Sequence, residues 1–266
     1  MSRRSEAMRR RKAPRLQQAE TATSPARVQA NRTRSLAIPV ALILVLPIFT
    51  TVGLLAHRTG HDINRRQVAQ EVSRLLAGIP QHGTTLGSPK APLTLWVYAD
   101  LECRDVKRFA RWGLSSIINT WVRNGTLKLA YRPLETDTQN QDIFANQEMA
   151  ALAAGGQDKM WNFALTFIHE QLEHYSNYAT DKFLNDIAAQ VDRLNTSRWR
   201  QERDDPQLFA SVAHSDRHAR AMGLSVTPVF LIGRTGEESV QIVGNPEIPG
   251  RFVNAESLQP YIESLS

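Results

Sequence analysis

Residues 35–56 form a run of 22 residues without a single charged side chain. An apolar run of about 20 residues is long enough to cross the hydrocarbon layer of a membrane as one helix. Pro39 and Pro47 lie inside the run, and a membrane helix tolerates proline where a soluble helix would end. The sequence therefore predicts one transmembrane helix over residues 35–57, in preference to a buried helix of a soluble core.

The positive charge on the two sides of this run predicts its orientation. Residues 1–34 hold ten of the 32 Lys and Arg residues, whereas four arginines follow within 20 residues of the run. This bias predicts a cytoplasmic N-terminus and an extracytoplasmic C-terminal part. A cleaved signal peptide is the alternative, but its apolar region has about 7–15 residues and ends in a small-residue cleavage site. Residues 54–56 (LLA) are a poor cleavage site, so we favour an uncleaved signal anchor in the cell membrane.

The net charge of +6 comes from residues 1–34, which carry +8, while the remaining residues carry −2. A nucleic-acid-binding domain carries its basic patch on the fold itself, so we predict no nucleic-acid partner. The tail has few large apolar residues, a composition typical of disorder. Its Lys and Arg residues are suited to anionic lipid headgroups, although a topology signal alone also explains them.

After the membrane segment, residues 58–86 are predicted to hold a juxtamembrane helix over 62–77 and then a linker rich in Gly, Pro and Thr. The globular domain is expected to span residues 87–266. Its hydrophobic pattern begins with a strand at 92–99, a helix at 103–123 and a strand at 127–131, and this order predicts two parallel strands joined by a right-handed crossover.

Helices are predicted next, and the chain then returns to two strands and a last helix. The helices are expected at 142–154, 159–172, 180–194 and 205–222, the strands at 228–232 and 239–243 as a hairpin, and the last helix at 256–265. The pattern as a whole predicts a mixed α/β domain in which four helices lie between a β-α-β unit and a final β-β-α unit.

Three segments of this domain carry recognisable motifs. They are residues 86–94 (LGSPKAPLT) with 98–103 (YADLEC), residues 150–163 (AALAAGGQDKMWNF) and residues 222–230 (MGLSVTPVF). In both the motifs and their order and spacing along the chain, the sequence resembles the DsbA-like thioredoxin-fold family, in particular the membrane-anchored BdbD-type thiol-disulfide oxidoreductases of Gram-positive bacteria. The resemblance covers residues 87–264 and implies a thioredoxin fold with an inserted helical subdomain over about residues 138–222.

One departure from the family is large. The C-x-x-C motif of the family corresponds here to Cys103-Arg104-Asp105-Val106, so Val106 stands at the position of the missing resolving cysteine. The chain has no other cysteine. A single cysteine also excludes an intramolecular disulfide, a multi-cysteine zinc site and an iron–sulfur cluster within one chain. The active site is therefore degenerate, and we expect no cofactor.

Cys103 is the candidate catalytic nucleophile, since a thiolate attacks disulfides. At the start of the predicted helix, unpaired N–H groups and the helix dipole favour negative charge on the sulfur. Arg104 adds a positive charge, while Glu102 and Asp105 oppose it, and we regard these three residues as modulators of the site. The sequence predicts an exposed and moderately activated thiol.

The resemblance places Val226, Thr227 and Pro228 in a substrate-binding loop with a cis Thr227–Pro228 bond. It implies that this loop faces the thiol and pairs its backbone with an extended peptide. Two functions stay open: monothiol disulfide exchange or isomerase-like shuffling through Cys103 with extracytoplasmic protein or small-thiol substrates, and a non-catalytic module that binds extracytoplasmic protein partners. The oligomeric state is not predictable from this pattern.

His214 and His218 lie four residues apart on a predicted helix, a spacing that suits a metal ion. Their neighbours are polar, and the helix has no H-E-x-x-H motif. We interpret the pair as part of a solvated helix face and predict no metal site.

Overall fold

The computed structural model describes residues 65–172, 177–243 and 253–266, which belong to one compact unit, Leu54–Ser266. Within these ranges no helix is both long and apolar enough to cross a membrane. The predicted tail at 1–34 and the predicted transmembrane helix at 35–57 lie outside the described residues.

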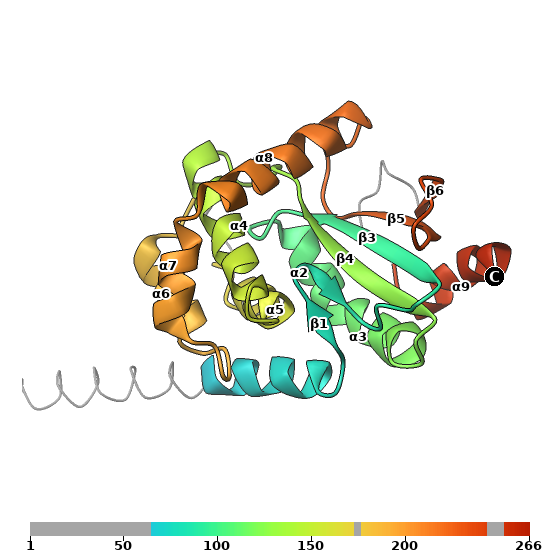
Figure 1. The fold of residues 1–266 in the computed structure, drawn as a ribbon, viewed down its shortest axis with the longest axis horizontal. Coiled ribbons are helices and arrows are strands. Elements are labelled where there is room, and N and C mark those ends of the chain that lie inside the picture. Colours follow the sequence, from blue (N-terminus) through green and yellow to red (C-terminus); the bar gives the residue numbers. More distant parts are fainter. Residues whose placement is uncertain (1–64, 173–176, 244–252) are drawn as a thin grey trace, which may run out of the picture. The chain divides into compact units, whose positions relative to one another are not determined.

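A sheet of six strands in the order β1-β2-β4-β3-β5-β6 forms the framework of the domain (Figure 1). The strands are β1 (Gln81–His82), β2 (Thr85–Leu86), β3 (Leu93–Ala99), β4 (Leu127–Pro133), β5 (Val229–Arg234) and β6 (Val240–Val243). The central strands β3 and β4 are parallel, as predicted, and β5 and β6 form the predicted antiparallel hairpin. The mixed α/β fold class is thus confirmed.

The first two strands lie within residues 58–86, in the part that was predicted to be a linker, and this prediction is wrong for them. β1 and β2 form a short antiparallel hairpin, and β2 pairs with β4 through Thr85–Ala130 and Leu86–Leu129. Leu86 is fully buried. The sheet therefore begins before Gly87, because partners distant in the sequence stabilise strands too short to show a pattern of their own. The preceding helix, described over residues 65–76, packs Val72 and Leu76 into the same core.

The predicted helix at 103–123 is divided into three parts. These are α2 (Arg104–Trp112), α3 (Leu114–Ile117) and the π-helical turn η1 (Ile118–Val122). Gly113 separates the first two, and a Cβ atom at this position would overlap the carbonyl oxygen of Val253. The break thus lies where the helix approaches the backbone that leads into α9 (Ala255–Leu265).

Where the structure describes the helical insertion, on both sides of residues 173–176, it has five helices, one more than predicted (Figure 1). They are α4 (Gln141–Gly155), α5 (Met160–His169), α6 (Asp181–Ala188), α7 (Thr196–Arg203) and α8 (Pro206–Ala221). α7 was not predicted, because its sequence TSRWRQER offers one apolar side chain and no apolar stripe. Asn195 caps it, and Trp199 is fully buried and donates its indole N–H to the Ala150 carbonyl, 2.8 Å away.

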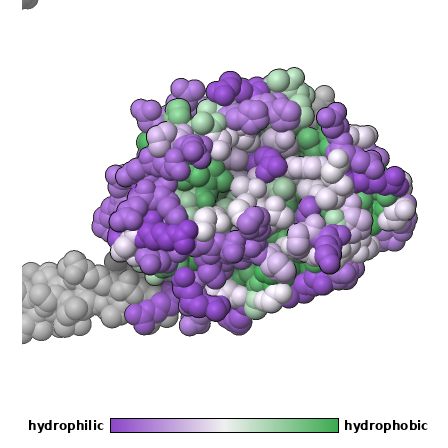
Figure 2. Space-filling model, in the orientation of Figure 1, coloured by the Kyte–Doolittle hydropathy of each residue, from purple (hydrophilic) through white to green (hydrophobic). Residues whose placement is uncertain are grey.

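Side chains of β3 alternate between the two faces of the sheet, as pleated strands require. Leu95 and Val97 belong to the main hydrophobic core, which also holds residues of α2, α4 and α5. Tyr98 belongs instead to a second, smaller cluster on the opposite face, with Trp96 packed against it. The surface in Figure 2 is mostly hydrophilic, with hydrophobic side chains in separate patches.

Candidate functional site

Cys103 lies in the turn between β3 and α2. Its N–H donates to the Asp100 carbonyl at 3.0 Å, and the residue is the N-cap of α2 with extended backbone angles. Its relative exposure is 4%, and it packs with the main core. The thiol is therefore at the predicted end of the helix, but the prediction that it is exposed is wrong, since neighbouring loops cover it.

The loop before β5 is the most direct of these neighbours. The Cys103 thiol donates to the Thr227 carbonyl oxygen, with 3.3 Å between Sγ and that oxygen. The Thr227–Pro228 peptide bond is cis, as the resemblance implied. Thr227 and Pro228 are buried, and Val226 is half-buried. The fold thus brings together Cys103 and the three loop residues across 124 positions of sequence.

The electrostatics of the thiol differ from the prediction of moderate activation. Burial raises the pKa of Cys103 to about 12, and the nearby charge of Asp137 also raises it. The hydrogen bond with Thr227 and the nearby backbone N–H groups of Asp105 and Val106 lower the pKa, but by less. The start of α2 does favour the thiolate, and the loss of water outweighs it.

A cavity of about 390 Å³ opens beside the thiol. Its lining comprises Cys103, Arg104, Asp105, Arg108, Thr136, Asp137, Ser225, Val226 and Thr227. Two of the predicted modulators, Arg104 and Asp105, therefore face the same space as the sulfur. Asp105 forms an ion pair with Arg108, and Arg104 is exposed. The cavity gives a partner molecule access to the loop, while Cys103, which is 4% exposed, forms part of its wall.

Glu102, the third predicted modulator, does not line this cavity. Its carboxylate accepts hydrogen bonds from the N–H groups of Asn177 (2.6 Å) and Tyr178 (3.1 Å). Burial raises the pKa of Glu102. The side chain thus joins the active-site turn to the helical insertion, which is a different position from the one beside the sulfur that the sequence suggested.

Val106 occupies the position of the missing resolving cysteine. It lies in the first turn of α2 and is 3% exposed. Its side chain belongs to the main hydrophobic core together with Phe109. An apolar residue therefore fills this position without opening the core, and it supplies no second thiol.

Sequence reasoning did not identify the loop after β4 as part of the site. Asp100 is fully buried, and its carboxylate accepts hydrogen bonds from the N–H groups of Thr136 (3.0 Å) and Thr138 (2.8 Å). The Thr136 hydroxyl in turn lies 2.5 Å from that of Thr227. The one available signal was the presence of Asp100 in the segment 98–103 (YADLEC) that carries the family resemblance, but the sequence does not reveal which loop it binds.

Neither the thiol site nor α8 forms a metal centre in the part of the chain that is described, where no group of three His, Cys, Asp or Glu side chains could hold an ion. The rings of His214 and His218 stack with centroids 6.1 Å apart on α8. Both residues are exposed.

Similar solved structures include BdbD from Bacillus subtilis in its oxidised form, with 16% identity and a TM-score of 0.57, covering 70% of this chain and 96% of that chain. DsbA from Chlamydia trachomatis has 16% identity and a TM-score of 0.55, with 68% and 90% covered. The thiol-disulfide exchange protein alpha-DsbA2 from Wolbachia pipientis has 15% identity and a TM-score of 0.50, with 78% and 98% covered. A comparison with curated proteins gave no match.

The family evidence agrees with this fold. A family model described as thioredoxin matches residues 81–241, which is more than half of the chain and includes the thiol, the insertion and the cis-proline loop. The sheet order and the helical insertion reproduce the architecture that the motifs implied. The chain therefore belongs to the thioredoxin family, and its domain has the DsbA-like form of the fold.

Proposed function

We propose that this protein exchanges thiol for disulfide with protein partners through Cys103 alone and so forms mixed disulfides. The observation that carries the proposal is the position of the only cysteine, at the N-cap of α2, against the Thr227 carbonyl and at the wall of an open cavity. Family membership and the similar structures support it.

The reaction needs no oxidant or reductant beyond the two partners. The Cys103 thiol loses its proton, and the thiolate attacks one sulfur of a partner disulfide. The partner S–S bond breaks, a bond between Cys103 and that sulfur forms, and the second partner sulfur leaves as a thiolate that takes up a proton. Because the chain has no second cysteine, an external thiol must release Cys103 by a second exchange.

The raised pKa of Cys103 makes both steps slow. With a pKa of about 12, roughly one thiol in 10⁵ is ionised at pH 7, against about 3% at an ordinary pKa of 8.5. The greater nucleophilicity of a basic thiolate offsets part of this loss. A thiolate of high pKa is also a poor leaving group, so an adduct at Cys103 is expected to persist. The proposed function is durable capture rather than rapid turnover.

Burial of the thiol favours a second function, that of a non-catalytic binding module. The exposure of Cys103 is 4%, and its thiol is hydrogen-bonded to Thr227. In that case an extended partner would pair with the Val226–Thr227 backbone by strand addition, and Cys103 would be no more than a buried apolar side chain.

We also propose that the domain works outside the cytoplasm, attached to the cell membrane by residues 35–57. The uncharged run and the excess of Lys and Arg before it support this orientation. Partners are then extracytoplasmic proteins or small thiols, and anionic lipids are the expected contacts of residues 1–34.

Trapping in cells tests the proposal. Cells that express the wild-type chain or Cys103→Ser are treated with an alkylating agent, and their membranes are separated on a non-reducing gel. Disulfide exchange predicts reducible adducts of higher mass with the wild type and none with Cys103→Ser. A single unshifted band with fully alkylated Cys103 would contradict exchange and favour the binding module. Co-purification of a non-covalent partner by both proteins would support that second function.

A further inference from the structure

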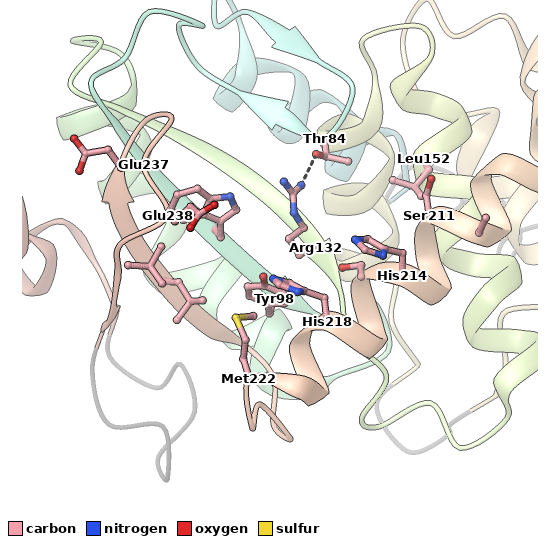
Figure 3. Close-up of a pocket in the computed structure, with 15 residues that line it drawn as sticks. Thr84, Tyr98, Arg132, Leu152, Ser211, His214, His218, Met222, Glu237 and Glu238 are labelled. Carbon is pink, nitrogen blue, oxygen red and sulfur yellow. Dashed lines mark hydrogen bonds between the residues drawn. The ribbon is translucent and has the colours of Figure 1, made fainter.

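We propose that a second cavity, between the sheet and α8, binds a small organic carboxylate with a flat apolar body. The cavity has a volume of about 880 Å³ (Figure 3), within the range of about 300–1,000 Å³ of ligand pockets. It shares no lining residue with the cavity beside Cys103. The inference is therefore independent of the thiol chemistry.

The body of the ligand is inferred from the apolar wall. Trp96 and Leu231 come from β3 and β5, Val240 from β6 and Leu152 from α4, and Met222 follows α8. Val240 and Met222 are each 39% exposed. Apolar side chains with this exposure around a concave space are a typical lining for the apolar part of a ligand.

The charge of the ligand is inferred from Arg132 on β4. Its Nη1 donates to the Thr84 hydroxyl (3.1 Å) and to the Tyr131 carbonyl (2.9 Å), both of which are neutral acceptors. No carboxylate pairs with this guanidinium among the described residues, and burial lowers its pKa. The guanidinium is half-buried, with neutral partners only in the described part of the chain, and a carboxylate of the ligand fits its planar set of donors.

Other polar groups define how such a ligand lies. The Tyr98 hydroxyl and the imidazoles of His214 and His218 line the cavity and offer further donors (Figure 3). Glu237 and Glu238, between β5 and β6, are the acidic residues of the lining, and both are exposed. They repel a second negative charge on their side of the cavity. The carboxylate is therefore directed to Arg132, and the apolar body lies along Trp96 and Leu231.

Titration calorimetry of the full-length chain with 2-naphthoate tests the inference, with the purification buffer and any detergent in it as the blank. The neutral analogue 2-naphthalenemethanol is titrated in parallel. We expect 2-naphthoate to bind about tenfold more tightly than the alcohol, and Arg132→Gln to abolish that difference. Arg217→Gln on α8, exposed and outside the lining, is the matched control and should bind as the wild type does.

A second variant, which fills the cavity, keeps the test decisive if Arg132→Gln does not fold. Ala210 is exposed and lines the cavity, so Ala210→Trp should fill the cavity, leave the fold intact and remove binding. Cys103→Ser should bind 2-naphthoate as the wild type does, which separates this site from the proposed exchange function. The inference is overturned if the wild type does not bind 2-naphthoate, if the alcohol binds equally well, or if Ala210→Trp leaves the affinity unchanged.

Discussion

The hydroxyl of Tyr131 lies 3.0 Å from a carboxylate oxygen of Glu148, and both side chains are buried inside the domain. Glu148 also accepts a hydrogen bond from the N–H of Leu101, two residues before the thiol. Burial raises the pKa of Glu148 well above its ordinary range, and the nearby charge of Asp100 adds to this. At a pH between the ordinary Glu pKa and this raised pKa, Glu148 therefore keeps its proton in the folded protein and loses it in the unfolded chain.

This difference predicts how stability depends on pH. Above the ordinary Glu pKa of about 4.3, the folded state binds more protons than the unfolded state, so the free energy of unfolding falls as pH rises. Glu148 contributes about 1 kcal/mol per pH unit to this fall. Glu148→Gln should flatten the profile in urea unfolding at pH 5, 6 and 7. Glu256→Gln, at an exposed position, should keep the wild-type slope, and equal slopes in all three proteins would contradict the assignment.

Asp137 predicts a change in thiol reactivity. Its charge raises the pKa of Cys103, so Asp137→Asn should lower that pKa. Because Asp137 is exposed, water and salt screen it, and we expect alkylation by iodoacetamide at pH 8 to become about threefold faster at low salt. The increase should shrink at 1 M NaCl. Asp204→Asn is the control at another exposed position, and an unchanged or slower rate with Asp137→Asn would contradict the prediction.

Local patterns were sufficient for the central elements of the fold. Each of β3, β4, β5 and α8 carries its own apolar run or periodicity, and the structure has all four close to the predicted ranges. β1, β2 and α7 were missed because their stability comes from distant partners. Leu86 pairs with β4, and Trp199 fills a space beneath α4.

The candidate site likewise has parts that the sequence predicted and parts that it did not. The resemblance supplied Cys103, Val106 and the cis-proline loop, since short motifs carry them. The burial of the thiol and the approach of Asp137 depend on where the loop after β4 lies. Asp100 fixes that loop through Thr136 and Thr138, and the sequence contains no local pattern for such a contact.

Removal of the Asp100 carboxylate tests whether this residue holds the loop after β4 in place. Asp100→Ala leaves the N–H groups of Thr136 and Thr138 without their acceptor inside the domain, which should cost about 3 kcal/mol in the free energy of unfolding. The loop should also move away from Thr227, so alkylation of Cys103 should become faster. Urea unfolding and alkylation rates measure both effects. Asp204→Ala at an exposed position should leave both unchanged, and a loss below about 1 kcal/mol for Asp100→Ala would contradict the role.

Val106→Cys restores the second thiol that the chain lacks. Val106 is 3% exposed and lies in the first turn of α2, three residues after Cys103. The new cysteine fills nearly the same volume and lies where an internal attack on a Cys103 adduct is possible. An internal thiol acts at a far higher effective concentration than an external one, so the Cys103 adducts seen on the non-reducing gel should fall about tenfold.

Two measurements separate this effect from a loss of folding. The intact mass of oxidised Val106→Cys should be lower by two hydrogens than that of its reduced form, which reports a bond between the two cysteines. Val106→Ser introduces a side chain of similar size without a thiol and should keep the wild-type amount of adducts. If Val106→Cys forms the internal disulfide and the adducts nevertheless persist at the wild-type level, the missing resolving cysteine is not what makes them durable. In that case the raised pKa of Cys103, which makes its thiolate a poor leaving group, is the remaining physical cause.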